Sequence, residues 1–263
     1  MNFTNKTFLI VGGTAGMGLT MTQKLLALGA NVVAIGLDDK TLVEERVQSP
    51  KNFTAIQGNA VEPEPIAQAI EIAVSQFGII HGLFHVAGGS GRRWGDGPLH
   101  EMTDEGWDKT LDLNMKSVMI SNRAIINYFI ENEVSGSILN MGSILASSPS
   151  PKFFVTHAYA AAKSALIGFS KSIAAYYAKN DIRVNVISPG LFITPMAARA
   201  AENEAIMGFI KTKQPLDGGR AGQTEDIVSA ALMFLNKESG FITGQVLAVD
   251  GGWSVSEGQY LEE

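Results

Sequence analysis

Short apolar runs alternate with longer amphipathic stretches along the chain. The first run, 8–11, has four apolar residues and no polar one, which is typical of a strand buried on both faces. Leucines then recur at helical spacing from Leu19 to Leu28, Gly29 ends that pattern, and a second apolar run follows at 31–35. This order predicts a strand, a helix and a second strand parallel to the first.

The same alternation continues toward the C-terminal end. It predicts further strands at 53–57, 82–86, 137–140, 182–187 and 245–249, and further helices at 66–77, 104–130, 159–179 and 226–235. Seven strands with intervening helices indicate a single α/β domain over residues 1–263, with a doubly wound (Rossmann) parallel sheet and helices on both faces. Two stretches, 88–98 and 195–222, are irregular, and we expect the second to form a mobile lid over a substrate.

Composition narrows the classes of function. The chain has 263 residues, 46% of them hydrophobic, which suits one large core. The absence of cysteine excludes disulfides and thiol catalysis and fits the cytoplasm, where we expect the protein. A net charge of −6 argues against a nucleic-acid partner, and no apolar run approaches the length of a membrane span. No metal site is expected, because metal-ligand spacing is absent among His81, His85, His100 and His157.

A glycine-rich loop separates the first predicted strand from the first helix. Its residues 12–18 read Gly-Gly-Thr-Ala-Gly-Met-Gly. In a strand–loop–helix context, glycine permits the turn and lets a pyrophosphate approach the backbone, while the helix N-terminus presents free N–H groups to it. The loop therefore predicts a dinucleotide site, with a purely structural turn as the alternative.

Tyr159 and Lys163 stand four residues apart on a predicted helix, so they share one face. A neighbouring ammonium favours the phenolate and lowers the pKa of a tyrosine, which makes the phenol a usable acid or base near neutral pH. A Tyr-x-x-x-Lys pair also arises by chance, so its meaning depends on the other motifs in the chain.

Taken in order, the motifs resemble those of the short-chain dehydrogenase/reductase family over nearly the whole chain. The matching positions are the cofactor glycines Gly12, Gly16 and Gly18, the strand end Ala87-Gly88, the helix residue Asn114, the trio Ser143, Tyr159 and Lys163, the clamp Pro189-Gly190 with Thr194, and the signature 249–252. The chain departs from the family pattern at Val11, Asn59-Ala60 and His85-Val86, where Thr, Asp-Val and two Asn are usual.

This resemblance implies a hydride transfer between a nicotinamide cofactor and the CH–OH or C=O group of a small secondary alcohol or ketone. Ser143 would hydrogen-bond the substrate oxygen and Tyr159 would exchange the proton. Lys163 would lower the pKa of Tyr159 and hold the nicotinamide ribose, and Asn114 would support a water chain. Plainer roles remain open for two of them: a turn cap for Ser143 and an idle polar position for Asn114. A non-catalytic dinucleotide-binding sensor or scaffold with the same fold is the alternative function.

The end of the second strand favours NAD over NADP. There the chain reads Gly36-Leu37-Asp38-Asp39, without the cation that a 2′-phosphate requires, and Ala15 in the glycine loop offers none. Asp38 can instead accept hydrogen bonds from ribose hydroxyls. The expected cofactor contacts are Gly12, Thr14, Gly16, Met17, Gly18, Leu37, Asp38, Asn59, Ala60, Val86, Ala87, Gly88, Tyr159, Lys163, Pro189, Gly190, Ile193 and Thr194.

The segments that flank the catalytic strand ends predict a mostly apolar substrate pocket. Arg92 and Arg93 break this pattern; they form either a solvated surface pair or a contact to a carboxylate or hydroxyl-rich end of the substrate. The expected substrate contacts are Trp94, Leu145, Phe153, His157, Phe192 and Met196.

Two long helices carry more apolar residues than one sheet face needs. They are 104–130, with Leu111, Leu113, Val118, Ile120, Ile125, Ile126 and Phe129, and the Tyr159 helix, with Leu166, Ile167, Phe169, Ile173 and Tyr177. Members of the family pair these helices across a two-fold axis, so we expect a homotetramer. The tail 253–263 is a candidate contact to a neighbouring subunit.

Overall fold

The computed structural model describes residues 1–48 and 51–258. Within them, one seven-stranded parallel sheet has the order β3-β2-β1-β4-β5-β6-β7. Its strands are β1 (Thr7–Val11), β2 (Asn31–Gly36), β3 (Phe53–Gln57), β4 (Ile80–His85), β5 (Gly136–Met141), β6 (Ile182–Pro189) and β7 (Val246–Val249). The doubly wound α/β fold is confirmed. The strand order reverses between β1 and β4, and such switch points bind ligands at the carboxyl ends of the strands.

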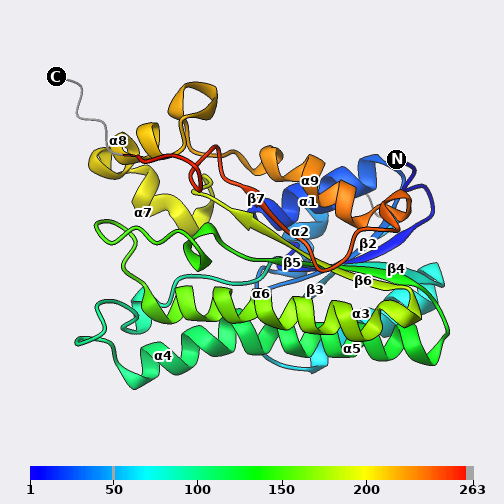
Figure 1. Cartoon of the computed structure of the whole chain (residues 1–263). Coiled ribbons are helices and arrows are strands. Elements are labelled where there is room, and N and C mark those ends of the chain that lie inside the picture. Colours follow the sequence, from blue (N-terminus) through cyan, green and yellow to red (C-terminus); the bar gives the residue numbers. More distant parts are fainter. Residues whose placement is uncertain (49–50, 259–263) are drawn as a thin grey trace.

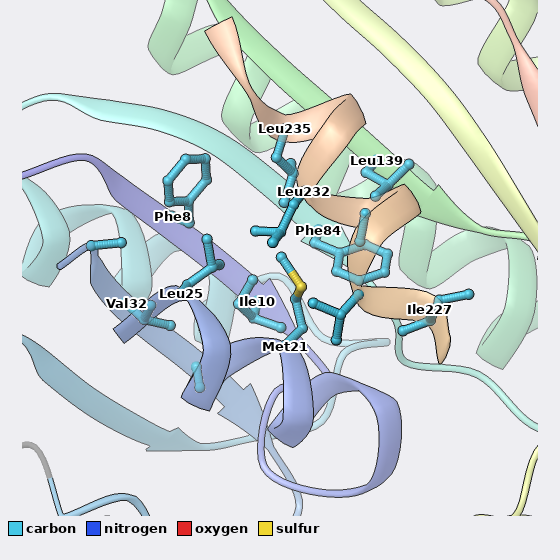
Figure 2. Packing of buried hydrophobic residues seen from close by; sticks show 14 of the residues in the cluster. Phe8, Ile10, Met21, Leu25, Val32, Phe84, Leu139, Ile227, Leu232 and Leu235 are labelled. Atoms are coloured by element: carbon cyan, nitrogen blue, oxygen red, sulfur yellow. The ribbon is translucent and has the colours of Figure 1, made fainter. Parts of the chain in front are cut away.

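Helices cover both faces of the sheet (Figure 1). One face carries α1 (Gly16–Ala27), α2 (Lys40–Val47) and α9 (Val228–Leu235); the other carries α3 (Glu64–Phe77), α4 (Asp104–Leu111), α5 (Ser117–Glu131) and α6 (His157–Tyr177). Alternation along β1 explains the two layers. Phe8 and Ile10 pack with α1 and α9, as Figure 2 shows, whereas Leu9 and Val11 pack into the opposite cluster. Every residue of β1 is buried, as its unbroken apolar run predicts.

The structure differs from the expected elements in three places. The stretch 40–47 forms α2, which was not predicted because Val43 is its only buried residue. The expected helix 104–130 is interrupted by a π-helical turn at Asp112–Lys116. The irregular stretch 195–222 contains α7 (Ala198–Ala201) and α8 (Glu204–Lys213), which lie together at one end of the molecule in Figure 1.

A buried amide pair joins the layers beneath the strand ends. Asn122 on α5 and Asn140 on β5 exchange two hydrogen bonds of 3.0 and 2.9 Å, and Asn140 also donates to Ser170 on α6 at 3.0 Å. Because each buried amide is satisfied, this network fixes how α5 and α6 sit against β5.

The start of the C-terminal tail packs within its own subunit. The Trp253 side chain is 1% exposed, donates its indole N–H to the Ser148 carbonyl at 3.2 Å and contacts the Phe154 and Phe209 rings. Trp253 itself is therefore buried within its own subunit, and residues 259–263 lie outside the described residues. In the part of the chain that the structure describes, no helix is both long and apolar enough to span a membrane.

Candidate active site

The glycine loop lies against the end of β4. Gly12 has a φ of +83°, and a Cβ there would approach the Ala87 nitrogen to 2.6 Å. A Cβ at Gly18 would collide with the Gly12 carbonyl oxygen, so α1 starts directly on the loop. Ala15 gives α1 no side-chain cap, and the first amides of the helix are available to an anion. This geometry fits the pyrophosphate of a dinucleotide.

The two acids after β2 have different roles. Asp39 caps α2 by accepting from the Thr41 and Leu42 amides at 2.9 and 3.3 Å. Asp38 accepts a 2.6 Å hydrogen bond from the Thr14 hydroxyl, so its carboxylate lies beside the glycine loop. Leu37 is 72% exposed, and of these two acids only Asp38 bonds to the loop.

The other expected cofactor residues lie at the same edge of the sheet. Thr194 faces the glycine loop, with its Cβ 3.7 Å from the position of a Cβ on Gly16. The Val86 and Ala87 amides donate to Val11, the Gly190 amide to Val249 and the Ile193 amide to Gly222. Asn59 and Ala60 follow β3, where the Asn59 side chain accepts from the Val61 amide at 3.3 Å; Met17 and Pro189 line the central cavity.

The expected catalytic trio comes together from β5 and α6. Ser143 follows β5, caps a 3₁₀ turn by accepting from the Leu145 amide at 3.2 Å, and lies close enough to the Tyr159 phenol to lower its pKa. It therefore acts as a turn cap and still reaches Tyr159. The Lys163 ammonium donates to the Met141 carbonyl at 2.8 Å and lies 5.7 Å from the centre of the Tyr159 ring.

Asn114 sits in the π-helical turn and is fully buried. Its side chain accepts from the Gly89 amide at 2.9 Å and donates to the carbonyls of Gly89 and Thr110 at 2.8 and 2.9 Å. A Cβ at Gly88 would lie 2.8 Å from Asn114 Oδ1 and 3.1 Å from Lys163 Nζ. Asn114 is therefore no idle position: it holds the end of β4 where only glycine leaves room beside Lys163. Such π turns interrupt helices most often at functional sites.

Burial dominates the electrostatics of the trio. It raises the pKa of Tyr159, and the Ser143 hydrogen bond only partly opposes this. Burial also lowers the pKa of Lys163 to about 7, so near neutral pH this amine carries its charge only part of the time. The net direction for Tyr159 is opposite to the one expected from the Tyr–Lys spacing, because desolvation of the phenolate outweighs any attraction to the ammonium.

His85 occupies a buried polar pocket behind Lys163. Its Nδ1 contacts the Ser121 hydroxyl at 2.7 Å and its Nε2 the Ala87 carbonyl at 3.1 Å, which places the proton on Nε2. Burial first, and the charge of Lys163 second, lower the pKa of His85 to about 3, against the effect of the Ala87 hydrogen bond. The imidazole is therefore neutral. It stands at the position where the family usually has an asparagine.

His85→Asn is expected to make the folded protein less sensitive to acid. In the unfolded chain a histidine binds a proton near pH 6.5, whereas folded His85 resists protonation until about pH 3, so stability is lost as the pH falls between these values. The variant should lose this contribution, about 1.4 kcal/mol per pH unit. Urea unfolding at pH 6.5, 5.5 and 4.5 measures the slope, with His100→Asn as the surface control. Equal slopes for wild type and variant would contradict this assignment.

Asp96 is a residue that sequence patterns did not single out. It is buried, and its two carboxylate oxygens accept from the amides of Ala158 and Tyr159 at 3.0 Å each. Thr156, the N-cap position of α6, makes no side-chain cap bond. Asp96 thus caps the catalytic helix from the distant 88–98 segment and interacts favourably with its dipole.

An apolar cavity opens beside the trio. Leu145, Phe192 and Met196 line it as expected, together with Ser143, Tyr159 and Lys163. Three expected residues do not line it. Trp94 stacks under Arg93, Phe153 packs on Phe209 while its neighbour Phe154 takes the cavity position, and His157 is exposed at the first residue of α6. These residues are close to the cavity residues along the chain, but closeness along the chain does not fix the direction in which a side chain points. Arg92, Arg199 and Trp253 also line the cavity.

Comparisons with known proteins agree with this architecture. A family model described as "Enoyl-(Acyl carrier protein) reductase" matches residues 12–254. A 3-oxoacyl-(acyl-carrier-protein) reductase FabG from Thermotoga maritima is 30% identical over 255 residues, covering 96% of this chain and 99% of the relative. The chain belongs to the short-chain dehydrogenase/reductase family. Another relative is 3beta-hydroxysteroid dehydrogenase 2 from Eggerthella lenta, 29% identical over 253 residues and 95% of each chain. A solved short-chain dehydrogenase/reductase from Mycobacterium ulcerans superposes with a TM-score of 0.89 at 27% identity, covering 98% of this chain and 93% of that one.

Membership of the short-chain dehydrogenase/reductase family makes the chain a relative of oxidoreductases that use nicotinamide cofactors. The residues present fit such a cofactor, since Met17 and Thr194 line the cavity and the uncapped start of α1 lies beside Thr194. No observation favours the non-catalytic alternative.

Proposed function

We propose that the chain is an oxidoreductase that interconverts a small secondary alcohol and its ketone, with Tyr159 as the acid and base. The observation that carries this is that Ser143, Tyr159 and Lys163 line one largely apolar cavity, with Asn114 and Lys163 meeting beside Gly88. A structural role alone gives no reason to group these four side chains around a cavity beside a glycine-rich loop.

The residues divide the chemistry between them. When bound, the nicotinamide supplies or accepts the hydride. During reduction Tyr159 gives its proton to the developing alkoxide oxygen while Ser143 donates a hydrogen bond to the same oxygen; oxidation runs in reverse. Lys163 holds the nicotinamide ribose and passes protons toward Tyr159, which its pKa of about 7 suits. Asn114 supports a water chain from Lys163 by holding the π turn in place, because its own amide already makes three protein hydrogen bonds.

A panel of secondary alcohols with NAD+, and of ketones with NADH, tests the proposal by the absorbance of reduced nicotinamide. Turnover of at least one pair supports it. Tight cofactor binding without turnover in either direction would favour the sensor or scaffold.

NAD is the preferred cofactor in this proposal. The Asp38 carboxylate, held by Thr14 beside the glycine loop, suits ribose hydroxyls and repels a 2′-phosphate. We expect a higher kcat/KM with NAD+ than with NADP+, and we expect Leu37→Arg to raise kcat/KM for NADP+ by about tenfold through one charged contact. Leu42→Arg, on exposed α2, controls for the added charge. Equal or better catalysis of the wild type with NADP+ would refute the preference.

The protein assembles as a homotetramer in this proposal, although not for the reason that the sequence first suggests. Half of the twelve apolar side chains expected at an interface are buried inside the subunit, namely Val118, Ile120, Ile125, Ile126, Phe129 and Leu166. The exposed side of α6 instead carries the small residues Ala161, Ala165 and Gly168, which permit close helix packing. Light scattering at micromolar concentration measures the mass, and a monomer there would contradict the assembly.

The segment 195–222 acts as the substrate lid. Its residues Met196 and Arg199 form part of the cavity wall, and Ile206 and Ile210 anchor it in a small cluster with Trp253. A lid of this kind closes over substrate and excludes water from the reacting atoms.

A further inference from the structure

Two arginines from distant parts of the chain line the active-site cavity. Arg92 begins the 3₁₀ turn after β4, and Arg199 lies on α7. Arg93 has a different place, since its guanidinium stacks 4.1 Å from the centre of the Trp94 ring and does not line the cavity. The structure therefore separates two neighbouring arginines that the sequence leaves equivalent, and it adds a second cation from the lid.

The charges of Arg92 and Arg199 lack a carboxylate partner. Neither forms an ion pair with any residue in 1–48 or 51–258. Arg92 donates to the neutral carbonyl of Phe153 at 3.2 Å, which orients its guanidinium. Asp96 acts on Arg92 only through space, because its two oxygens are bonded to the first amides of α6.

The two guanidinium groups line the same cavity, where their charges repel each other. Partial burial lowers the pKa of Arg92, the charge of Arg199 lowers it further, and Asp96 acts in the opposite direction. Arg220 shows the usual arrangement elsewhere in the chain, with hydrogen bonds to both Asp217 and Asp226. Two like charges facing one cavity are stabilised when an anion binds between them.

We propose that Arg92 and Arg199 bind a carboxylate at the end of the substrate remote from the reacting carbon. The planar fork of arginine matches a carboxylate through paired hydrogen bonds. The cavity that this pair shares with Tyr159 is lined largely by apolar residues, with Leu145, Phe154, Leu191 and Met196 among them. The substrate is thus a hydroxy acid or oxo acid with an apolar stem. This inference rests on the proposed function, because it takes the cavity as the substrate site.

Binding of unreactive probes tests the arginine pair without turnover. Hexanoate and octanoate, and the neutral amides of the same length, are titrated calorimetrically into the protein with saturating NAD+. We expect each acid to bind the wild type about 10- to 100-fold more tightly than its amide, from charge-assisted hydrogen bonds. Arg92→Ala and Arg199→Ala should each remove most of this difference. Arg93→Ala, the matched control, should leave it unchanged.

Several results would overturn the inference. The first is equal affinity of the wild type for acid and amide, and the second is an acid preference that survives in the Arg92→Ala/Arg199→Ala double variant. The third is a loss of NAD+ affinity in parallel with loss of the acid preference, which would assign the arginines to the cofactor phosphates. Tighter binding of octyl phosphate than of octanoate would show that the arginine pair recognises a phosphate ester and not a carboxylate.

A turnover assay separates this inference from the proposed function. Secondary hydroxy acids of four to ten carbons and their methyl esters are assayed with NAD+ on the same variants. If acids bind more tightly than amides but no alcohol is oxidised, the result would support carboxylate binding by the arginine pair and contradict the proposed oxidoreductase function. If acids and esters are oxidised with equal kcat/KM, the result would support the oxidoreductase function and contradict carboxylate binding by the arginine pair.

Discussion

Tyr159→Phe is expected to lower kcat by about 10²- to 10⁴-fold, the usual contribution of a positioned general acid or base. The ring still fills its place on α6, and only the phenolic oxygen is lost. Cofactor affinity should therefore change little. Stopped-flow or steady-state absorbance of reduced nicotinamide measures kcat, and quenching of protein fluorescence measures cofactor binding.

Tyr176→Phe is the matched control for this experiment. Tyr176 lies on the same helix but is 65% exposed, so removal of its hydroxyl should leave kcat unchanged. Loss of cofactor binding together with activity in Tyr159→Phe would point to a disturbed fold. Full activity of Tyr159→Phe would show that the proton travels by another group.

The positions of the chemistry-bearing residues at strand ends could be predicted from the sequence. Apolar runs such as 8–11 mark buried strands, and in a parallel sheet every carboxyl end meets one edge. Gly12, Gly88, Ser143 and Pro189 each follow a strand or end one, so the fold brings them to a common edge. Local pattern and global topology agree at these points, which is why the prediction succeeds.

Long-range contacts explain what the sequence did not reveal. The π turn around Asn114 adds a residue to a helix without changing its apolar content, so periodicity cannot detect it. The bond from Asp96 to α6 joins residues more than sixty positions apart, and no local motif marks it. Arg199 lies in a stretch whose two short helices, α7 and α8, have no strong common period. The sequence pattern also does not predict the direction of a side chain, as the exposed position of His157 shows.

Lys163→Met is expected to lower activity and, at neutral pH or below, to stabilise the protein without cofactor. In the folded state burial lowers the pKa of Lys163 to about 7, against 10.5 for an unperturbed lysine. Between these pH values the unfolded chain binds one more proton than the folded one, so this lysine makes stability rise with pH. Lys163 therefore lowers the free energy of unfolding by its full amount below pH 7, and this destabilisation vanishes near pH 10.5. Methionine removes that destabilisation at similar length. Under the proposed mechanism activity falls, because Tyr159 loses its proton donor and the cofactor ribose loses the ammonium that holds it.

Urea unfolding of wild type and Lys163→Met at pH 6, 7.5 and 9 measures the effect. The free energy of unfolding of the variant relative to wild type should fall by up to about 1.4 kcal/mol per pH unit above pH 7. Lys171→Met, at an exposed position of the same helix, should show no such trend. A difference that stays constant, or that grows with pH, would mean that Lys163 keeps its charge in the folded protein. In that case the ammonium remains available to stabilise the Tyr159 phenolate directly, and the trio would work as a charged pair without proton exchange at the lysine.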